Sequence, residues 1–519
     1  MSETKIADPE PRADTAMTEL DPREKLLVTL SLMLAMAVAA LEQTVVSTAM
    51  PSIVSELKGV RIYPWVSSAY LLAFTISTPL YGKLADLWGR KRVLLFGLAL
   101  FLLGSALSGL AWSMPVLIAM RVVQGLGFGA IMPIVLTIIG DVFTLRERAR
   151  VQGWFSSVWA VSGLLGPLIG GVLTDQASWR WVFFVTLPFG LFAMGVLAFC
   201  YRERLPANRP ASIDWLGAAL LAAATSSLLL LLLGKSDWGW LVRGGLGCGA
   251  VGALGAFIAW EKRAREPILP LDLFQNRTLT ASILGSFVIG SLLFLIEVYL
   301  PLYIQGVAGG SAIKSGVQLT PLLLSWSLSV MVAARAVLRH GFRRAALTGS
   351  LLITLGMALI AIGTIATAHT SALFFLGMLI IGLGMGPTSL SYILSVQSSV
   401  PWQRRGVATG ALSYFRTMGG ALVVAALGAI LAARVAGQVA AQVDIAAALR
   451  PESHQLLDES QLLAVRDVLR HALRDIFLVS TAIAGLGLLC AWNLPRTATD
   501  PPSPTPEKSN QNGNSVQID

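Results

Sequence analysis

The chain has 519 residues, of which 55% are hydrophobic and 13% are charged, and its formal net charge is +10. A soluble protein is usually about one-quarter charged, so this composition argues against a large soluble enzyme and indicates a chain whose solvent is mostly lipid. The basic residues recur in short connectors between apolar runs, a pattern typical of lipid headgroup contact and membrane topology rather than of nucleic-acid binding. The three cysteines lie in apolar runs, so we predict no disulfide framework.

Apolar runs long enough to cross a bilayer, which needs roughly 20 residues per helix, follow one another along the chain. We predict 14 transmembrane helices, at residues 26–50, 62–82, 92–112, 114–138, 149–173, 181–201, 213–234, 243–261, 279–304, 313–336, 346–368, 372–396, 406–433 and 475–494. The polar ends, 1–25 and 495–519, are predicted to be disordered tails. Between the last two spans, the external loop 434–474 has a heptad-like apolar spacing that suggests a helix lying on the membrane surface.

Lys and Arg concentrate in alternate connectors, which places those connectors and both tails in the cytoplasm. The spans also repeat, because Arg148, Gly153 and Gly163 recur 257 residues later as Arg405, Gly410 and Gly420. With an offset of 252, Gly89 and Arg92 meet Gly341 and Arg344. Repeated halves with a substrate site between them are a transporter architecture.

The predicted fold is therefore an all-α membrane protein of two pseudo-symmetric six-helix bundles with a central inserted helix pair. The N-terminal bundle covers residues 26–201, the inserted pair with its linkers covers 202–278, and the C-terminal bundle covers 279–494.

A dense cluster of charge, "GKLADLWGRKRV" (82–93), interrupts the apolar chain between the second and third spans. Its Lys and Arg residues could serve topology alone, but that does not explain Asp86 or the two glycines. Gly82 and Gly89 allow close approach of a neighbouring backbone. Asp86 can bind a helix N-terminus or an arginine across an interface. We therefore predict a cytoplasmic gate formed by Gly82, Asp86, Gly89 and Arg90, with a second cluster at Arg339 and Arg343.

The cluster resembles the loop signature of the major facilitator superfamily, Gly-x-Leu-Ala-Asp-x-x-Gly-Arg-Lys. Other segments match in order: "RVVQG" from Arg121 resembles the family's Arg-x-x-Gln-Gly, and "SGLLGPLIGG" resembles its antiporter motif. With 14 spans, the chain resembles the drug:proton antiporter subfamily. Glu42 stands where Asp is commoner, Thr186 where Asn is usual, and Ser162 where a further Gly is usual in the antiporter motif.

Ionisable residues inside spans cost roughly 2.5–3.5 kcal/mol each on insertion scales, so each requires a reason. The resemblance implies that Glu42 lies near Arg121, either as a structural ion pair or as a proton carrier tuned by the arginine. In the second interpretation, proton and substrate compete for Glu42, so that binding of one releases the other and the protein works as an antiporter. Glu297, at a similar depth in the second half, is either a coupling residue or a side chain that reaches toward the outer face.

The antiporter motif of the fifth span contains Gly166, Pro167, Gly170 and Gly171. Gly-Pro permits a bend and the later glycines permit close packing. A generic kinked membrane helix would contain the same residues.

We predict a proton-driven exporter of amphiphilic, cationic compounds, and not an enzyme. Alternatives are an exporter of the same fold dedicated to one metabolite, siderophore or lipid, and a membrane receptor or scaffold that transports nothing. The expected partners are the substrate, protons and the bilayer of a bacterial inner membrane, with a monomer as the expected form. No cofactor, metal or nucleic acid is expected, and the absence of a Gly-x-x-x-x-Gly-Lys-Ser/Thr phosphate loop argues against nucleotide binding.

Overall fold

The computed structural model of this chain describes residues 21–58, 62, 65–201, 203, 213–233, 238–310, 312–365, 370–438 and 459–496. Within these ranges the regular structure is helical. The predicted tails lie outside the described residues, apart from the few that border the first and last helices.

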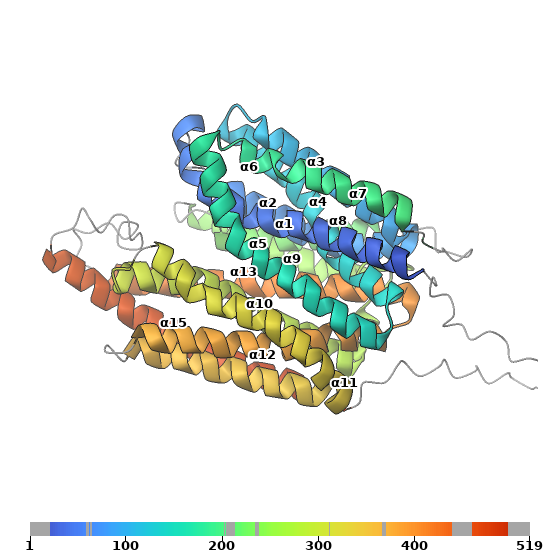
Figure 1. Cartoon of the computed structure of the whole chain (residues 1–519). Helices are drawn as coiled ribbons and strands as arrows, with labels where there is room; N and C mark the ends of the chain where they lie inside the picture. The colour runs from blue at the N-terminus through green and yellow to red at the C-terminus, as the bar shows by residue number, and fades with distance from the viewer. Residues whose placement is uncertain are drawn as a thin grey trace, which may run out of the picture.

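The first group of helices packs around shared apolar cores and lies on one side of the molecule (Figure 1). It consists of α1 (Pro22–Leu57), α2 (Trp65–Trp88), α3 (Arg90–Gly109), α4 (Met114–Val142), α5 (Leu145–Gln176), α6 (Trp181–Phe184) and α7 (Thr186–Cys200). Local chemistry sets the ends of these helices. Gly89 has a φ of 99°, which ends α2 and starts α3. Thr144 and Glu147 form a reciprocal capping box at the start of α5.

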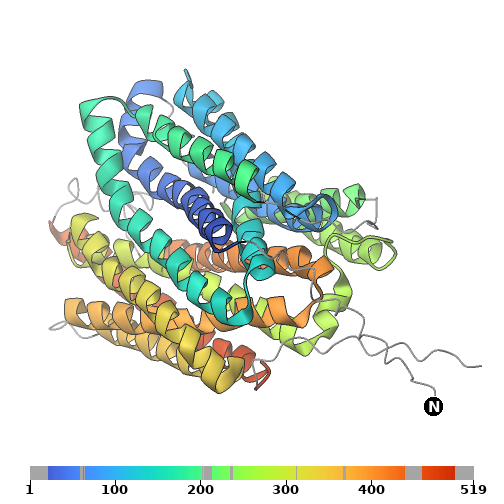
Figure 2. The same ribbon diagram turned by 45° about the vertical axis from the view of Figure 1, so that its right-hand side comes forward.

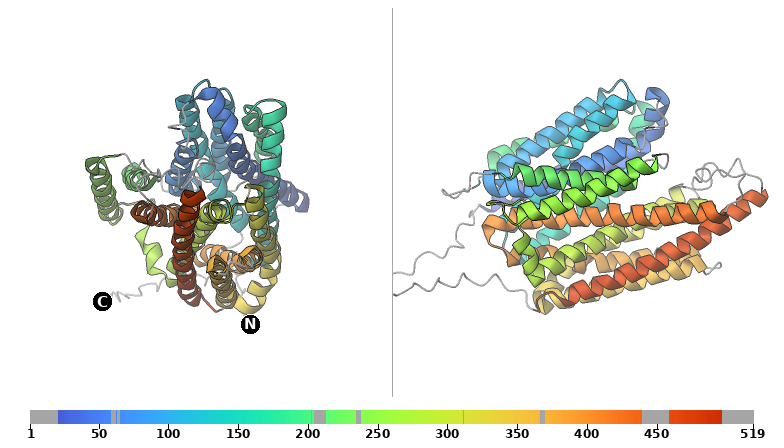
Figure 3. Two further views of the ribbon diagram at one scale, coloured as in Figure 1. Left: turned by 90° about the vertical axis from the view of Figure 1, so that its left-hand side faces the viewer. Right: turned by 180° about the vertical axis from the view of Figure 1, so that it is seen from behind.

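The next two helices, α8 (Trp215–Leu233) and α9 (Trp240–Glu261), pack against each other at the side of the molecule, as the left view of Figure 3 shows. Helix α8 contacts α2 and α13, whereas most of α9 is exposed. A connector then returns to the body through η2 (Leu271–Gln275).

The remaining helices lie together on the other side, coloured yellow to red in Figure 2. They are α10 (Arg277–Leu302), the π-helical η3 (Tyr303–Val307), α11 (Ala312–Ile365), α12 (Thr370–Ser399), the short η4 (Trp402–Arg404), α13 (Arg405–Gln438) and α15 (Glu459–Trp492). Asn276 begins α10 by accepting hydrogen bonds from the backbone N–H groups of Thr278 and Leu279.

The described residues contain 12 helices that are long and apolar enough to cross a membrane. Two differences from the prediction concern this number. Helix α2 is not among the 12, and the candidate Lys314–Ile365 contains two predicted spans in one continuous stretch. Within that stretch, Gly341 has a φ of 81° and kinks the helix.

The prediction of a separate surface helix within 434–474 is wrong for the described part of this range. Residues 439–458 lie outside the described part of the chain, but from Glu459 onward the structure has a single helix that continues into the last span. The apolar spacing at Leu469 and Leu473 reflects burial of both side chains in the protein core rather than contact with a membrane surface.

The largest contacts between the two sides of the molecule are those of α2 with α13 and of α11 with α5. The sequence offsets relate α2 to α11 and α5 to α13, so the two contacts involve corresponding segments of the repeat. The positive φ angles of Gly89 and Gly341 also recur at the offset of 252.

Candidate functional site

Gly82 of α2 and Gly406 of α13 bring the backbones of the two helices into direct contact. They lie at the end of the molecule that carries Arg90 and Arg405, which we call the basic end. A Cβ on Gly82 would lie 2.7 Å from the carbonyl oxygen of Gly406, and a Cβ on Gly406 would lie 2.5 Å from that of Gly82. Neither position therefore accepts a side chain without moving backbone. The predicted close approach at Gly82 is present, and the partner is the first turn of α13.

Asp86 lies one turn after Gly82 and points at the N-terminus of α13. Its Oδ1 accepts a hydrogen bond of 3.0 Å from the backbone N–H of Gly406, and its Oδ2 accepts one of 2.8 Å from that of Val407. The Asp86 side chain is 5% exposed. Free N–H groups at a helix N-terminus favour a negative charge, so the carboxylate binds the end of α13 by hydrogen bonds and by the helix dipole.

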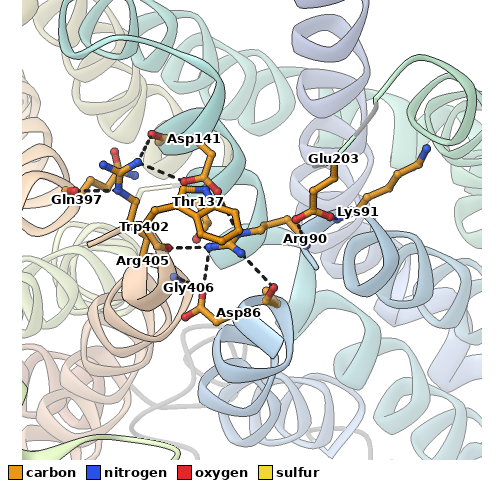
Figure 4. Close-up of polar contacts among 12 residues, drawn as sticks. Asp86, Arg90, Lys91, Thr137, Asp141, Glu203, Gln397, Trp402, Arg405 and Gly406 are labelled. Atoms are coloured by element: carbon orange, nitrogen blue, oxygen red, sulfur yellow. Dashed lines mark hydrogen bonds and ion pairs between the residues drawn. The ribbon is translucent and has the colours of Figure 1, made fainter. Parts of the chain in front are cut away.

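Arg90 completes the contact and is fully buried (Figure 4). Its Nη2 donates to Asp86 at 2.8 Å and to the carbonyl of Trp402 at 2.9 Å. Its Nε lies 3.0 Å from Asp141 Oδ2, and its guanidinium carbon lies 3.9 Å from the centre of the Trp402 ring. Asp141 also pairs with Arg405 at 3.4 Å. We call Asp86, Arg90, Asp141, Trp402 and Arg405 the Asp86 cluster.

Residues of the flanking connectors hold the cluster from outside. Glu203 accepts hydrogen bonds of 2.8 and 3.0 Å from the backbone N–H groups of Arg90 and Lys91, which caps the start of α3. Lys83 pairs with Glu266 at 2.7 Å. Both acids lie in the connectors on either side of α8 and α9, so the inserted pair is anchored to the basic end.

Arg339 and Arg343, predicted as a second gate cluster, do not join the first. Arg339 is exposed, whereas the guanidinium of Arg343 stacks 3.9 Å from the centre of the Trp492 ring. The reason is visible in the repeat, because Leu338 occupies the position that Asp86 has in the first copy. Without a carboxylate there is nothing to bind arginines and a facing helix N-terminus together.

Glu42 and Arg121 meet deep inside the molecule, as predicted for the first and fourth spans. Glu42 Oε1 lies 2.6 Å from Arg121 Nη1, and the two residues are 0% and 2% exposed. Arg121 also donates to Gln124 and lies 4.1 Å from the centre of the Tyr70 ring. The pair is thus a buried ion pair whose arginine contacts an aromatic wall.

A cavity of about 210 Å³ lies between the two groups of helices. Apolar side chains dominate its wall, which includes Phe74, Phe128, Trp159 and Trp326. Glu42 does not line this cavity, although its neighbour Gln43 does. The carboxylate that lines it is Glu297, which is exposed, and Arg416 of α13 faces the same space. Sequence alone left the direction of Glu297 and Arg416 open, and both contribute to the cavity wall.

Comparison with known proteins identifies the family of this chain. The family model of the Major Facilitator Superfamily matches residues 32–424. The chain belongs to the major facilitator superfamily. It is 37% identical over 415 residues to the multidrug transporter protein MdtP of Bacillus subtilis (strain 168), covering 79% of this chain and 76% of that protein. It is 35% identical over 407 residues to multidrug resistance protein 3 of the same organism, covering 78% and 79%.

Solved structures confirm the major facilitator fold. The crystal structure of the human organic anion transporter MFSD10 (TETRAN) aligns with a TM-score of 0.60 at 15% identity, over 89% of this chain and all of that one. The proton:xylose symporter XylE aligns with a TM-score of 0.58 at 15% identity, over 92% and 97%. Family and fold make this chain a multi-pass membrane transporter rather than an enzyme.

The antiporter motif of this major facilitator lies in α5 and faces α1. A Cβ on Gly166 would lie 1.8 Å from Thr44 Oγ1, and one on Gly170 would lie 2.2 Å from Thr48 Oγ1. Close packing is therefore present at these two glycines. At Gly171 a Cβ would meet nothing within 4 Å, so the packing predicted there is absent. Pro167 lies within α5, but its side chain lies outside the described part of the structure.

Several residues in and around the Asp86 cluster were not predicted from the sequence. Trp402 gave no signal except its place in "PWQRRG", just before the start of α13. Glu203 and Glu266 look like ordinary charges in basic connectors. Their partners lie more than 100 residues away along the chain, and only the fold brings them together.

Proposed function

We propose that this chain is a proton-driven antiporter that exports amphiphilic compounds by alternating access. Multidrug transporters among its relatives support the class of substrate. In this proposal α2 is a further span, and the candidate Lys314–Ile365 is two spans divided at Gly341, which brings the 12 candidates to 14. They form two six-helix halves with α8 and α9 inserted between them.

The basic end faces the cytoplasm of a bacterial cell, by the excess of Lys and Arg in its connectors, and both termini lie on that side. The described conformation is then closed to the cytoplasm by the Asp86 cluster. Opening requires α13 to leave the Asp86 carboxylate, which costs those charge-assisted hydrogen bonds. The cluster is therefore a cytoplasmic gate.

The buried pair of Glu42 and Arg121 is the observation that carries the proposal for proton coupling. Protonating Glu42 removes one charge of the pair and leaves Arg121 buried without its counter-ion, a state that costs several kcal/mol. The side chains around the arginine must then rearrange. Buried ionisable pairs of this kind inside a span mark proton relays.

A contiguous path connects this pair with the cavity. Arg121 lies over the Tyr70 ring, whose centre lies 6.1 Å from that of Phe74 and 5.6 Å from that of Phe128. Both phenylalanines line the cavity. We therefore propose that Glu42 holds the proton, that the substrate binds in the cavity beside Glu297, and that Arg121 couples the two. Direct competition for Glu42, as the sequence suggested, would require a conformation in which Glu42 reaches the cavity.

The driving force is sufficient without a bound cofactor. One proton moving through 100 mV releases about 2.3 kcal/mol. A tenfold proton gradient adds about 1.4 kcal/mol. Together they support a concentration ratio of several hundred for a neutral substrate.

The decisive experiment compares wild type, Glu42→Gln and Glu261→Gln in proteoliposomes. Glu261 is the matched control, because it is a buried carboxylate near the basic end that accepts backbone hydrogen bonds from Ile268 and Leu269. Glu42→Gln should lose uptake driven by a pH gradient but keep counterflow of substrate, while Glu261→Gln keeps both. If Glu42→Gln shows pH-driven uptake at the wild-type rate, the proposed role of Glu42 as proton carrier is refuted. Absence of counterflow in the wild type would favour a receptor or scaffold, and transport of one compound from a broad panel would favour a dedicated exporter.

A further inference from the structure

The cavity wall carries two opposite charges that form no direct salt bridge with each other. Glu297 of α10 and Arg416 of α13 are the charged residues among its lining. Among the residues that the structure describes, no direct salt bridge joins them, although the two charges attract each other at longer range. Each charge thus faces the space that a substrate would occupy.

Backbone geometry places the two residues at different levels of the cavity. A Cβ on Gly290 would lie 1.8 Å from the carbonyl oxygen of Arg416, so α10 and α13 touch at this level. Glu297 lies seven residues further along α10, which is two turns on the same helix face, or about 10 Å along the axis. The two side chains therefore start from different depths of the cavity.

An aromatic ring holds Arg416 in this position. Its guanidinium carbon lies 5.4 Å from the centre of the Trp326 ring, a cation–π distance, and Trp326 is itself part of the wall. The ring thereby gives the guanidinium a partner other than Glu297. The indole N–H groups of Trp159 and Trp326 are buried and have no hydrogen-bond partner in the described structure. Both residues line the cavity.

These observations bear on the charge of the substrate. A simple cation would be attracted by Glu297 but repelled by Arg416, and a simple anion would meet the reverse. Either one would leave one charge of the wall without a counter-charge once the ligand had displaced water from the cavity, which is costly. A ligand that carries both charges pairs with both residues.

We infer that the cavity binds amphiphilic zwitterions, with an ammonium group at Glu297 and a carboxylate at Arg416. The flat apolar body packs on Trp326 and the neighbouring aromatic side chains. This inference rests on the proposed export function, because it names the substrate class of the same cavity. It replaces the simple cation that the sequence suggested.

The test uses five dansyl compounds that share one fluorescent body. Dansylamide is neutral, dansylcadaverine carries an amine, and N-dansyl-6-aminohexanoic acid carries a carboxylate. Nα-dansyl-lysine and Nε-dansyl-lysine carry both charges at different separations. Binding to the full chain in lipid nanodiscs is followed by dansyl fluorescence at neutral pH. We expect one of the lysine isomers to bind at least about 10-fold more tightly than the singly charged compounds, as one additional charge-assisted hydrogen bond provides.

Two variants identify the residues responsible. Arg416→Gln should remove the advantage of the zwitterion over the amine, and Glu297→Gln should remove its advantage over the carboxylate. Arg416→Lys and Glu297→Asp keep the charges and should keep the ranking. Unchanged binding of dansylamide shows that a variant is folded. If Arg416→Gln or Glu297→Gln loses dansylamide binding, the conclusion is drawn from the wild-type ranking of the five compounds and from the ranking in the charge-keeping variant.

Equal binding of dansylcadaverine and both lysine isomers by the wild type would overturn the inference, as would a ranking that neither variant changes. The outcome is separate from that of the proposed function. Preferential binding of a zwitterion by a chain that fails to couple protons would refute antiport and leave this inference standing. Proton-coupled export with no preference among the charged compounds would support antiport and overturn this inference.

Discussion

Replacing Asp86 with Asn should open the basic end without damaging the cavity. In Asp86 each carboxylate oxygen accepts from one backbone N–H, of Gly406 or of Val407; Asn puts an NH₂ group in place of one of these oxygens, so a donor there faces a donor. It also loses the ion pair with Arg90, which keeps Asp141 as a partner. Removing one partner of a buried pair costs about 3–5 kcal/mol, and we take the lower value because Arg90 remains paired.

A loss of about 3 kcal/mol shifts the equilibrium between closed and open gate about 100-fold toward the open state. A protein that is closed in 99 of 100 molecules would then be about half open. Such a shift is large enough to be seen as a second population rather than as a change in one mean distance.

Electron–electron distance measurement between spin labels provides the assay. Arg92 and Gln403 are exposed at the basic end on the two facing sides of the gate, so labels can be attached there. The background lacks the three native cysteines, Cys200, Cys248 and Cys490, and must still transport. Asp86→Asn should add a population at longer distance. A distribution identical to that of the parent would refute the gate as described.

Asp272→Asn is the matched control for the same measurement. Asp272 pairs with Arg404 at 2.5 Å, close to the gate, but both side chains are about half exposed. An exposed pair contributes about 0–1 kcal/mol, which corresponds to a shift of at most about fivefold. A control that opens as far as Asp86→Asn would mean that any loss of charge at this end has the same effect.

Two further predictions concern helix packing and the opposite end of the molecule. Gly170→Ala should lower thermal stability by about 1–3 kcal/mol, because its Cβ would meet Thr48, whereas Gly171→Ala should be neutral or stabilising by up to about 1 kcal/mol; equal melting temperatures for both variants would contradict the packing of α5 on α1. Hydrogen bonds, led by that from Arg180, lower the pKa of Glu56 from its ordinary value of 4.5. The contribution of Glu56 to stability is therefore present above pH 4.5 and lost as the pH falls through the lowered pKa. The melting temperatures of wild type and Glu56→Gln should keep a constant difference from pH 8 to pH 6 and converge in acid; a difference that changes between pH 6 and pH 8 would contradict this assignment.

The sequence predicts the spans well because the bilayer imposes a simple requirement on each of them. A helix that crosses hydrocarbon needs about 20 apolar residues, and the helices observed here follow those runs closely. Helix α2 is the exception among the predicted spans, because it is not one of the 12 candidates. Its serines, its threonines and the charged end at Lys83 and Asp86 lower its hydropathy. Several of these polar residues, among them Thr75, Ser77 and Thr78, are buried in a helix that packs against α4 and α13.

The site was predicted only where a residue is unusual in its own surroundings. Asp86, Glu42 and Arg121 stand out because a charge in an apolar chain has a cost that must be offset. Trp402 is less visible, because it joins the Asp86 cluster only when helices distant in sequence meet. Whether Arg416 faces a cavity depends on the rotation of α13 about its axis, which its neighbours decide.

The second gate cluster shows the limit of reasoning from a repeat. Gly341 has a positive φ like Gly89, so the turn is present in both halves. The acid Asp86 is present only in the first half, because Leu338 occupies the equivalent position in the second. Charge pattern and turn geometry are therefore separate properties, and the first does not follow from the second.

Leu338 also makes the two halves of the chain unequal partners. A chimaera built from two copies of the C-terminal half would have an aliphatic side chain at both inter-half joints and nothing to bind a helix end there. One built from two N-terminal halves would carry the acid twice. The present chain has the acid in α2 and an aliphatic side chain at the equivalent position of α11, so the two corresponding contacts between its halves are not chemically equivalent.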